Sequence, residues 1–285
     1  MTNAFTTLIE ANELAHHLGQ PRWCLIDCRH DLANPSFGRE AYERGHLPGA
    51  WFFHLDEDLS GPMTGTNGRH PLPDPERLAH RLGACGVDRD TQVVAYDDAG
   101  GMFAARLWWL LRWMGHHPVA VLDGGFQAWC AAAKVLTTEL PRAVPARFEP
   151  VLQPAGAVNA AYVEQHLGHP DMVLVDARSP DRFRGENENL DPVGGHIPGA
   201  LNRFFKDNLG ADGRFKQASV LREEFATVLR GRDPRKVVHQ CGSGVTACHN
   251  QLAMESAGLT GSRLYPGSWS EWCADPTRPV TTGPQ

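Results

Sequence analysis

The sequence predicts an α/β protein in which one fold is built twice in tandem. Four blocks of the first half recur in the same order about 150 residues later, so the chain contains an internal repeat. In both halves, short apolar runs alternate with segments of helical period, a pattern that favours parallel strands joined by helices. A proline-rich segment separates the halves, as is typical of a linker. We therefore expect two domains, each a mainly parallel sheet flanked by helices.

The four repeated blocks fix how the halves correspond. They are HHLGQPRWCLIDCR (16–29) with QHLGHPDMVLVDAR (165–178), RGHLPGAWFF (44–53) with GGHIPGALNRFF (194–205), VVAYDDAGG (93–101) with VVHQCGSGV (237–245), and LDGGFQAW (122–129) with LYPGSWSEW (264–272). A common order and a nearly constant spacing indicate a duplication.

The same elements are expected in order in each half. A short helix ends at Gly19 or Gly168, since glycine suits a helix C-terminus. A strand (CLIDC or VLVDA) follows, then a turn-rich stretch, H-[LI]-P-G-A and a short extended segment. Next come a helix (PERLAHRLGACG or SVLREEFATVLRG), an apolar strand, a turn, a long helix and a last strand. The long helix MFAARLWWLLRWM contains Arg106 and Arg112, so we interpret it as a buried helix and not as a membrane span.

These elements predict the domain boundaries. Residues 1–139 form the N-terminal domain and residues 158–285 the C-terminal domain. Residues 140–157 contain four prolines and no amphipathic period, so we expect an extended linker there.

Composition narrows the possible functions. The formal net charge of -6 over 285 residues gives no reason to expect a nucleic-acid or membrane partner. The seven cysteines are scattered and form no CxxC pair, so neither a disulfide framework nor a metal site is predicted. The N-terminus has no basic start followed by an apolar region, so no secretory signal is expected. We predict a cytoplasmic protein with reduced thiols.

Cys241 is the candidate nucleophile. It follows the apolar run KVVHQ and precedes a Gly-rich turn and a helix-period segment, while Asp97 stands at the matching place in the first half. A carboxylate is a poor replacement for a packing cysteine, so the second domain is predicted to be catalytic and the first inactive. A thiolate is the reactive form of cysteine, and a helix N-terminus favours an anion. The alternative is an inert buried cysteine at a strand end.

The residues after Cys241 are predicted to bind the substrate. Gly242 and Gly244 are expected to take positive φ and turn main-chain N–H groups toward the sulfur, with Val245 and Thr246 completing the loop. A cysteine phosphatase needs a cation to hold the phosphoryl group, but the sixth residue after Cys241 is Ala247 and the loop contains no cation. A cradle of neutral amides better suits a monoanion such as a persulfide.

The chain resembles the two-domain rhodanese-type sulfurtransferases. The resemblance covers essentially the whole chain and rests on the duplicated D-[AC]-R and H-[LI]-P-G-A, on C-G-S-G-V-T-A and on G-S-W-S-E-W. It implies that Cys241 accepts a sulfane sulfur as a persulfide, without a cofactor or metal. It also implies a small sulfur donor and a thiol acceptor such as thioredoxin, or cyanide.

The resemblance also suggests which donor is used. Family members that use 3-mercaptopyruvate tend to read CGSGVT, as this chain does, whereas thiosulfate enzymes tend to have basic residues after the cysteine. Arg182 stands where the family places an arginine for the donor carboxylate, with Arg184 nearby, but GENENLDP replaces a P-E-P-R segment that carries a second arginine in some relatives. Thiosulfate is the alternative donor, and a non-enzymatic persulfide carrier is a further alternative.

A proton relay is the last implication of the resemblance. Ser243 follows the nucleophile by two residues, His70 matches a family histidine and Asp56 matches its partner. Histidine titrates near neutral pH, and the departing pyruvate enolate needs a proton. The alternative is that His70 is an ordinary loop histidine and Ser243 only completes the loop.

Overall fold

The computed structural model describes residues 4–142 and 144–284, and these residues form two compact units. The first unit contains residues 1–61, 73–153 and 211–214, and the second contains residues 62–72, 154–210 and 215–285. Each unit therefore includes a short segment from the other half of the sequence. The segment 62–72, which carries the candidate His70, belongs to the second unit.

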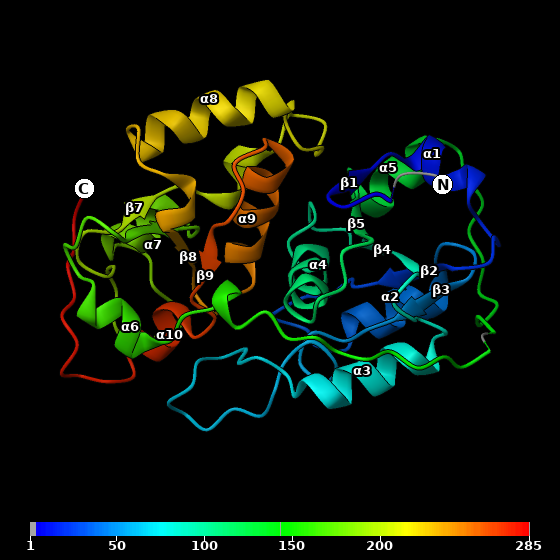
Figure 1. Ribbon diagram of the computed structural model, residues 1–285, viewed down its shortest axis with the longest axis horizontal. Coiled ribbons are helices and arrows are strands. Elements are labelled where there is room, and N and C mark those ends of the chain that lie inside the picture. Colours follow the sequence, from blue (N-terminus) through cyan, green and yellow to red (C-terminus); the bar gives the residue numbers. More distant parts are fainter. Residues whose placement is uncertain (1–3, 143, 285) are drawn as a thin grey trace. The chain divides into compact units, whose positions relative to one another are not determined.

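The first unit is built on a parallel sheet with the strand order β1-β5-β4-β2-β3 (Figure 1). The strands are β1 Leu8–Ile9, β2 Trp23–Asp27, β3 Ala50–Phe52, β4 Gln92–Tyr96 and β5 Val119–Leu122. The helices are α1 Ala11–His16, α2 Phe37–Arg44, α3 Pro75–Ala84, α4 Ala104–Trp113 and α5 Gly125–Ala131. Because β2 and β4 are buried on both faces, their central residues, 24–26 and 93–95, are continuously apolar, as is typical of this fold class.

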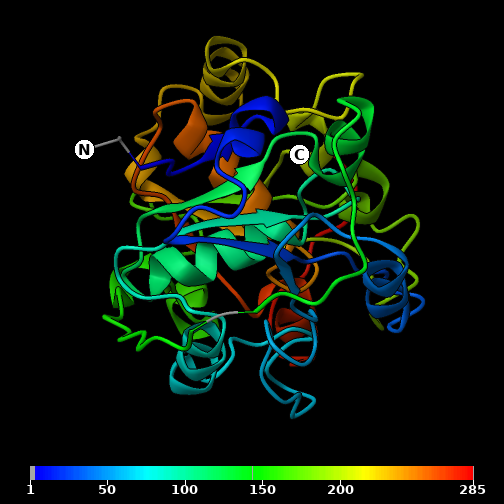
Figure 2. The ribbon, with the colours of Figure 1, turned by 90° about the vertical axis from the view of Figure 1, so that its right-hand side faces the viewer.

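Helices cover both faces of the first sheet. Leu14 of α1 and Trp129 of α5 share one core cluster with Leu25, Val94 and Leu122 of the strands. Helix α4 contacts β4 and β5, and Figure 2 shows it on the other side of the sheet from α1. The sheet is therefore the middle layer of three.

The second unit repeats this arrangement with the strand order β7-β6-β8-β9, again parallel. Its strands are β6 Val173–Asp176, β7 Leu201–Asn202, β8 Val237–Gln240 and β9 Arg263–Leu264. Its helices are α6 Ala160–Gln165, α7 Pro180–Arg184, α8 Ala218–Leu229, α9 Thr246–Ser256 and α10 Ser268–Trp272, with the 3-10 turns η1 Pro154–Gly156, η2 Phe205–Asn208 and η3 Pro234–Lys236. At the place of β1, Ala157 makes a single parallel bridge to Leu264.

The faces of the second sheet are also covered. Val163 of α6 and Trp272 of α10 lie in one core cluster with Leu174 and Val238. Helix α9 packs on β8 and α8 packs on α9, and Figure 1 shows these two helices on the side of the strands away from α6 and α10. The predicted α/β class and parallel sheets are confirmed.

The repeated D-x-R motif is a structural lock in both units. The Arg29 guanidinium donates to Asp27 and to the carbonyl oxygen of Gly45, and Arg178 does the same with Asp176 and Gly195. The lock ties the end of the second strand of each repeat to the H-[LI]-P-G-A turn. It thereby fixes the carboxyl-end edge of each sheet, where the candidate site residues lie.

Candidate active site

Cys241 lies directly after β8, at the carboxyl end of a central strand. Its N–H donates to Ser268 Oγ at 3.1 Å, and its carbonyl oxygen accepts from the N–H of Trp269 at 3.0 Å. The residue is buried, with 2% of its surface exposed. The chain then turns within four residues, and Thr246 is the first residue of α9. The cysteine is therefore placed at a strand–loop–helix turn, as the sequence predicts.

The two glycines of the loop act differently from each other. Gly244 has φ +76°, and a Cβ there would lie 2.3 Å from the carbonyl oxygen of Pro266. The φ of Gly242 lies outside the left-handed region, so the prediction of positive φ at Gly242 is wrong. A Cβ at Gly242 would lie 2.8 Å from Arg69 Nη2 and 3.7 Å from the Arg182 guanidinium, so the ends of these two arginine side chains lie directly against Gly242.

Asp97 occupies the position in the first unit that corresponds to Cys241 in the second. Its carboxylate accepts hydrogen bonds from the main-chain N–H groups of Ala99, Gly101, Phe103 and Ala104, each at 2.8 Å. Burial raises the pKa of Asp97, and these four amides oppose that rise. The turn after this strand thus gathers several amides around one acidic side chain. The duplication makes the same turn around Cys241 a candidate anion site.

His70 and Ser243 lie together within the second unit. Their Nδ1 and Oγ atoms are 2.7 Å apart, and both residues are buried. Residues 62–72 bring His70 there: the N–H of Arg69 donates to Ser270 Oγ at 3.0 Å, and Gly68 (φ +83°) would carry a Cβ only 2.7 Å from the carbonyl oxygen of Gly267. A proton can therefore pass between the imidazole and the serine hydroxyl.

Asp56 belongs to the first unit. Its side chain is 47% exposed, and its Oδ2 lies 4.0 Å from His30 Nε2 and 3.9 Å from His54 Nδ1. The pairing of Asp56 with His70 stays a prediction.

Arginines from outside the loop supply the positive charge near Cys241. Arg182 binds Glu188 through two nitrogens, at 2.7 and 3.1 Å, and Arg69 pairs with Asp191. Both guanidinium groups lie against Gly242 and remain partly exposed. The sequence predicts only neutral amides around Cys241, whereas the structure also places two positively charged side chains there.

A third arginine, Arg178, lies deeper. Burial lowers its pKa, but the charges of Asp176, Glu188 and Cys241 together raise the pKa above the usual arginine value. Arg178 is therefore a permanent cation in the surroundings of Cys241. Burial raises the pKa of Asp191 while Arg69 opposes it, and the hydrogen bond from Arg182 helps to hold the pKa of Glu188 low against burial.

Arg184 has a different environment. It pairs with Glu186, two residues away, at 2.7 Å, and both side chains are substantially exposed. The predicted donor-binding role of Arg184 stays a prediction, and the geometry gives Arg69 and Arg182 the better positions.

Sequence reasoning missed Arg69, Ser268 and the acidic pair Glu188 and Asp191. Arg69 directly precedes His70 in GRHPLP, and this adjacency was the available signal. Ser268 lies in GSWSEW and has φ +54°, unusual for a residue other than glycine, while its Oγ accepts from Cys241 N–H. The acidic pair lies in the segment GENENLDP, where P-E-P-R was the expected pattern.

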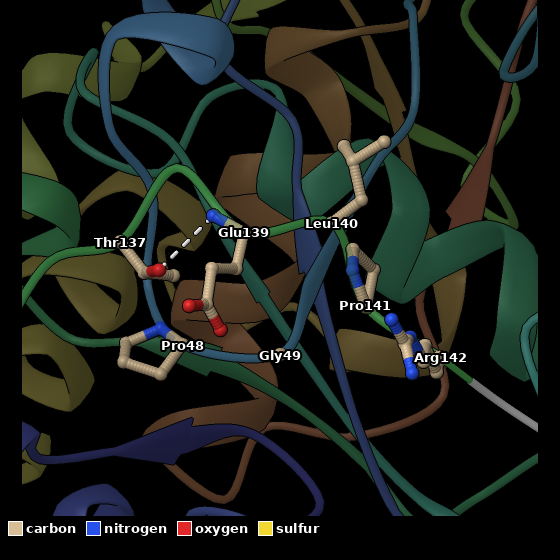
Figure 3. A pocket seen from close by; sticks show the side chains of 7 residues that line it. All are labelled: Pro48, Gly49, Thr137, Glu139, Leu140, Pro141 and Arg142. Atoms are coloured by element: carbon tan, nitrogen blue, oxygen red, sulfur yellow. Dashed lines mark hydrogen bonds between the residues drawn. The ribbon is translucent and has the colours of Figure 1, made fainter.

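A separate pocket of about 940 Å³ lies in the first unit (Figure 3). Its walls are Pro48, Gly49, Thr137, Glu139, Leu140, Pro141 and Arg142. The main-chain N–H of Glu139 donates to Thr137 Oγ1 at 3.0 Å. Since the residues lining it include no thiol or imidazole, we assign this pocket no part in nucleophilic chemistry.

Comparison with known families identifies the architecture. The family model of the Rhodanese-like domain matches residues 10–132 and, a second time, residues 159–275. The chain belongs to the rhodanese-like family. This membership confirms the resemblance noted in the sequence, including its two tandem domains.

Relatives cover almost the whole chain. A protein of Pseudomonas aeruginosa named probable 3-mercaptopyruvate sulfurtransferase is 50% identical over 97% of this chain and 98% of its own length. A Mycobacterium tuberculosis protein named putative thiosulfate sulfurtransferase is 38% identical over 97% of each chain. The solved structure of SseA from Escherichia coli, described as a 3-mercaptopyruvate sulfotransferase, has a TM-score of 0.79 at 31% identity over 93% of this chain and 99% of that one.

In the part of the chain that the structure describes, no helix combines the length and the apolar character needed to cross a membrane.

Proposed function

We propose that this rhodanese-like protein is a sulfurtransferase that moves a sulfur atom from 3-mercaptopyruvate through Cys241 to a thiol. The observation that carries the proposal is the placement of two guanidinium groups, from Arg69 and Arg182, against Gly242, the residue next to Cys241. Planar guanidinium groups bind carboxylates strongly. A donor with one carboxylate and one terminal sulfur can therefore be held with its sulfur toward the nucleophile.

The reaction has two steps. The Cys241 thiolate attacks the sulfur of 3-mercaptopyruvate, an S–S bond forms, and the C–S bond breaks with its electron pair passing to carbon. Pyruvate leaves as its enolate and takes a proton, and the persulfide stays on Cys241. An acceptor thiolate then attacks the outer sulfur, which releases the Cys241 thiolate and a persulfide of the acceptor. The scheme uses no metal and no organic cofactor.

His70 and Ser243 supply the proton for the leaving enolate. Their 2.7 Å contact gives a hydroxyl beside the nucleophile and an imidazole that can recharge it. Asp56 is proposed as the group that orients His70, as the family resemblance implies. Gly244, Val245 and Thr246 are proposed to complete the amide cradle, by analogy with the turn that holds the Asp97 carboxylate.

Thiosulfate is the second candidate donor. Arg69, Arg178 and Arg182 together give more positive charge than a single carboxylate requires, which favours a dianion. The buried acids Glu188 and Asp191 offset this charge, however, and leave the surroundings closer to what a monoanion needs. We therefore rank 3-mercaptopyruvate first.

The proposed acceptor is a thiol, with thioredoxin or a small thiol as the physiological form and cyanide as a laboratory substitute. We propose that the reaction takes place in the reducing cytoplasm, where the cysteines stay as thiols.

Steady-state assays with cyanide test the proposal. Mixing the protein with 3-mercaptopyruvate is expected to release pyruvate and thiocyanate over many turnovers, with a higher kcat/KM than thiosulfate gives. The Cys241→Ser variant is expected to be inactive, and Cys130→Ser, which removes an exposed thiol, to be fully active. Full activity of Cys241→Ser would defeat the proposal, and stoichiometric loading only by a partner protein would favour a persulfide carrier.

A further inference from the structure

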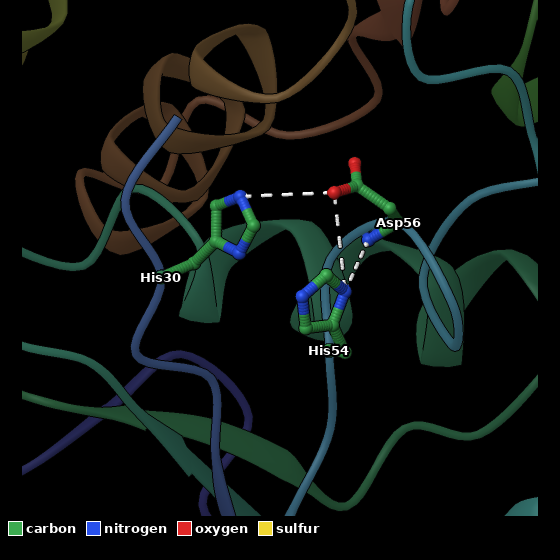
Figure 4. A group of neighbouring side chains, drawn as sticks. All are labelled: His30, His54 and Asp56. Carbon is green, nitrogen blue, oxygen red and sulfur yellow. Dashed lines mark hydrogen bonds and ion pairs between the residues drawn. The ribbon is translucent and has the colours of Figure 1, made fainter. Parts of the chain in front are cut away.

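Two histidines and an aspartate meet at the carboxyl-end edge of the first sheet. Strands β2 and β3 are parallel neighbours, with Asp27 paired to Phe52. His30 follows β2 by three residues, and His54 and Asp56 follow β3 by two and four. The ends of adjacent parallel strands thus bring the three side chains together within the first unit (Figure 4). Their nearest ligand atoms, one from each residue, all lie within 4.8 Å of one another.

The hydrogen bonds of His54 fix which ring nitrogen is free of a proton. Its Nε2 lies 2.9 Å from the carbonyl oxygen of Pro35, which can only accept, so Nε2 carries the proton. Its Nδ1 is then a lone-pair atom, and it accepts from the main-chain N–H of Asp56 at 3.1 Å. An imidazole held by a backbone carbonyl in this way is the usual arrangement of a metal-bound histidine.

This tautomer leaves two electron-rich atoms facing each other. His54 Nδ1 carries no proton to share with Asp56 Oδ2, although the two atoms are only 3.9 Å apart. His30 Nε2 approaches the same oxygen at 4.0 Å, and the two imidazole rings meet edge to face with their centres 5.0 Å apart. A cation between the three atoms could accept an electron pair from each of them.

We propose that His30, His54 and Asp56 form a binding site for a divalent transition-metal ion of the Zn²⁺ class. Two imidazoles and one carboxylate are a common three-ligand set for this class, with the remaining position open to water. The histidine side chains are buried, whereas Asp56 is 47% exposed and gives the ion a path from solvent. Ligand atoms around tetrahedral Zn²⁺ are about 3.4 Å apart, so the carboxylate oxygen has to move by about half an ångström toward each imidazole. The two imidazole nitrogens, which lie within 4.8 Å of each other, have to reach the same spacing by movement of the rings.

Binding has one identifiable cost. The ion would take the lone pair of His54 Nδ1 from the N–H groups of Asp56 and Glu57, which lie 3.1 and 3.4 Å away. These N–H groups belong to the exposed turn after β3, where water can replace the lost acceptor. The cost is therefore small beside the gain of a coordination bond. The pattern has no sequence motif, since His30 and His54 are 24 residues apart in the chain.

Calorimetric titration of the full-length, chelator-treated protein with Zn²⁺ tests the site. One saturable site per chain is expected, together with a rise in the melting temperature of the wild type. Asp56→Asn and His54→Gln are expected to weaken this binding at least tenfold, in line with the sensitivity of metal sites to altered ligands. His169→Gln is the matched control, since His169 also lies beside an aspartate, with its Nδ1 3.5 Å from Asp171, and it should bind Zn²⁺ like the wild type.

Three outcomes would overturn the proposal. They are the absence of saturable binding, equal affinity in Asp56→Asn and wild type, and thiolate-to-cobalt charge transfer in the absorption spectrum of the Co²⁺-loaded protein, which would place the ion on cysteine. If His54→Gln fails to fold, Asp56→Asn still decides, because Asp56 is half exposed. None of these readouts depends on sulfur transfer, so the result is independent of the proposed function.

Discussion

At the scale of single residues, the environment of Cys241 depends on side chains that are distant in sequence. Arg69 and Arg182 approach Gly242 from different segments, and His70 reaches Ser243 from residues 62–72. The loop residues 242–246 carry no charge, so the charged neighbours of Cys241 come from other parts of the fold. Glu188 and Asp191 form ion pairs with these two arginines, and their negative charges offset the positive charge near Cys241.

The arginine pair makes a prediction for donor binding. Arg69→Ala and Arg182→Ala should each lower kcat/KM for 3-mercaptopyruvate by about 10- to 100-fold, mainly through KM, because a charge-assisted hydrogen bond contributes about 1.5–3 kcal/mol. Arg184→Ala is the control and should change kcat/KM less than threefold, since Arg184 is paired with exposed Glu186. A larger effect at Arg184 than at Arg69 would show that the donor lies elsewhere.

At the scale of elements, the strand–loop–helix turn is the unit that the duplication has preserved. In the first repeat it connects β4 to α4 and encloses Asp97, and in the second it connects β8 to α9 and presents Cys241. In both repeats, a main-chain N–H at the start of the following helix donates a hydrogen bond to the first residue of this turn. Phe126 N–H donates to the carbonyl oxygen of Asp97, and Trp269 N–H donates to the carbonyl oxygen of Cys241. The same turn therefore accommodates two different side chains, a carboxylate in the first repeat and a thiol in the second.

The first turn should depend on its carboxylate for stability. Asp97→Ala removes the acceptor of three buried main-chain N–H groups and one partly buried one, and each unsatisfied buried group costs about 1–3 kcal/mol. We expect the free energy of unfolding to fall by at least about 3 kcal/mol in urea denaturation at neutral pH. Asp98→Ala, one residue along, should cost less than half as much, and equal losses would mean that the amide bonds contribute little.

Strand β8 carries a pH-dependent contribution to stability. His239 is fully buried, neither of its ring nitrogens has a hydrogen-bond partner among the described residues, and burial lowers its pKa to about 3. The unfolded chain therefore takes up a proton below about pH 6.5, whereas the folded chain does not until about pH 3, so stability is lost as the pH falls through this range.

The size of this effect can be measured. At 1.36 kcal/mol per pKa unit, His239 should cost about 2 kcal/mol of unfolding free energy between pH 6.5 and pH 5. His239→Leu should remove that part of the pH dependence in urea titrations at pH 7 and pH 5. His116, whose pKa burial lowers to about 4, supplies a similar dependence that the variant keeps. An unchanged difference between the two pH values would contradict the assignment.

Some of these helices and strands can be predicted from the sequence and others cannot. The repeat and the apolar strands were enough to predict the parallel sheets and the position of Cys241, because these depend on local periodicity and on burial. The sequence predicts turn-rich stretches where the short helices α2 and α7 lie, because segments of five to eight residues show too little helical periodicity to predict a helix. The His30–His54–Asp56 group could not be predicted, because its proximity depends on which strands become neighbours. For Arg69, the only signal in the sequence is its place directly before His70.

At the scale of the whole molecule, the two units are not simply the two halves of the sequence. Residues 62–72 belong to the second unit, and residues 211–214 belong to the first. The predicted domains 1–139 and 158–285, with a linker at 140–157, stay predictions in their boundaries. Any division of the chain at the linker would separate Cys241 from both Arg69 and His70.

This exchange of segments predicts the behaviour of an isolated second half. A chain of residues 154–285 contains Cys241 but lacks His70 and Arg69, so its sulfur transfer should be at least about 100-fold slower than that of the full chain, in line with the usual contribution of a general acid. The full-length double variant Arg69→Ala/His70→Gln is the control and should show a loss of similar size. An active second half would rule out an essential part for the segment 62–72.

The carboxylate buried in the first turn has a consequence for the capacity of the protein. The Asp97 carboxylate is bound covalently to the chain and accepts hydrogen bonds from the main-chain N–H groups of this turn, so the turn has no room for a substrate atom. Under the proposed function, only the turn at Cys241 can take up a sulfur atom, so each catalytic cycle transfers one sulfur atom per chain. The duplicated turn in the first unit contributes no second transfer site, because its own side chain fills it.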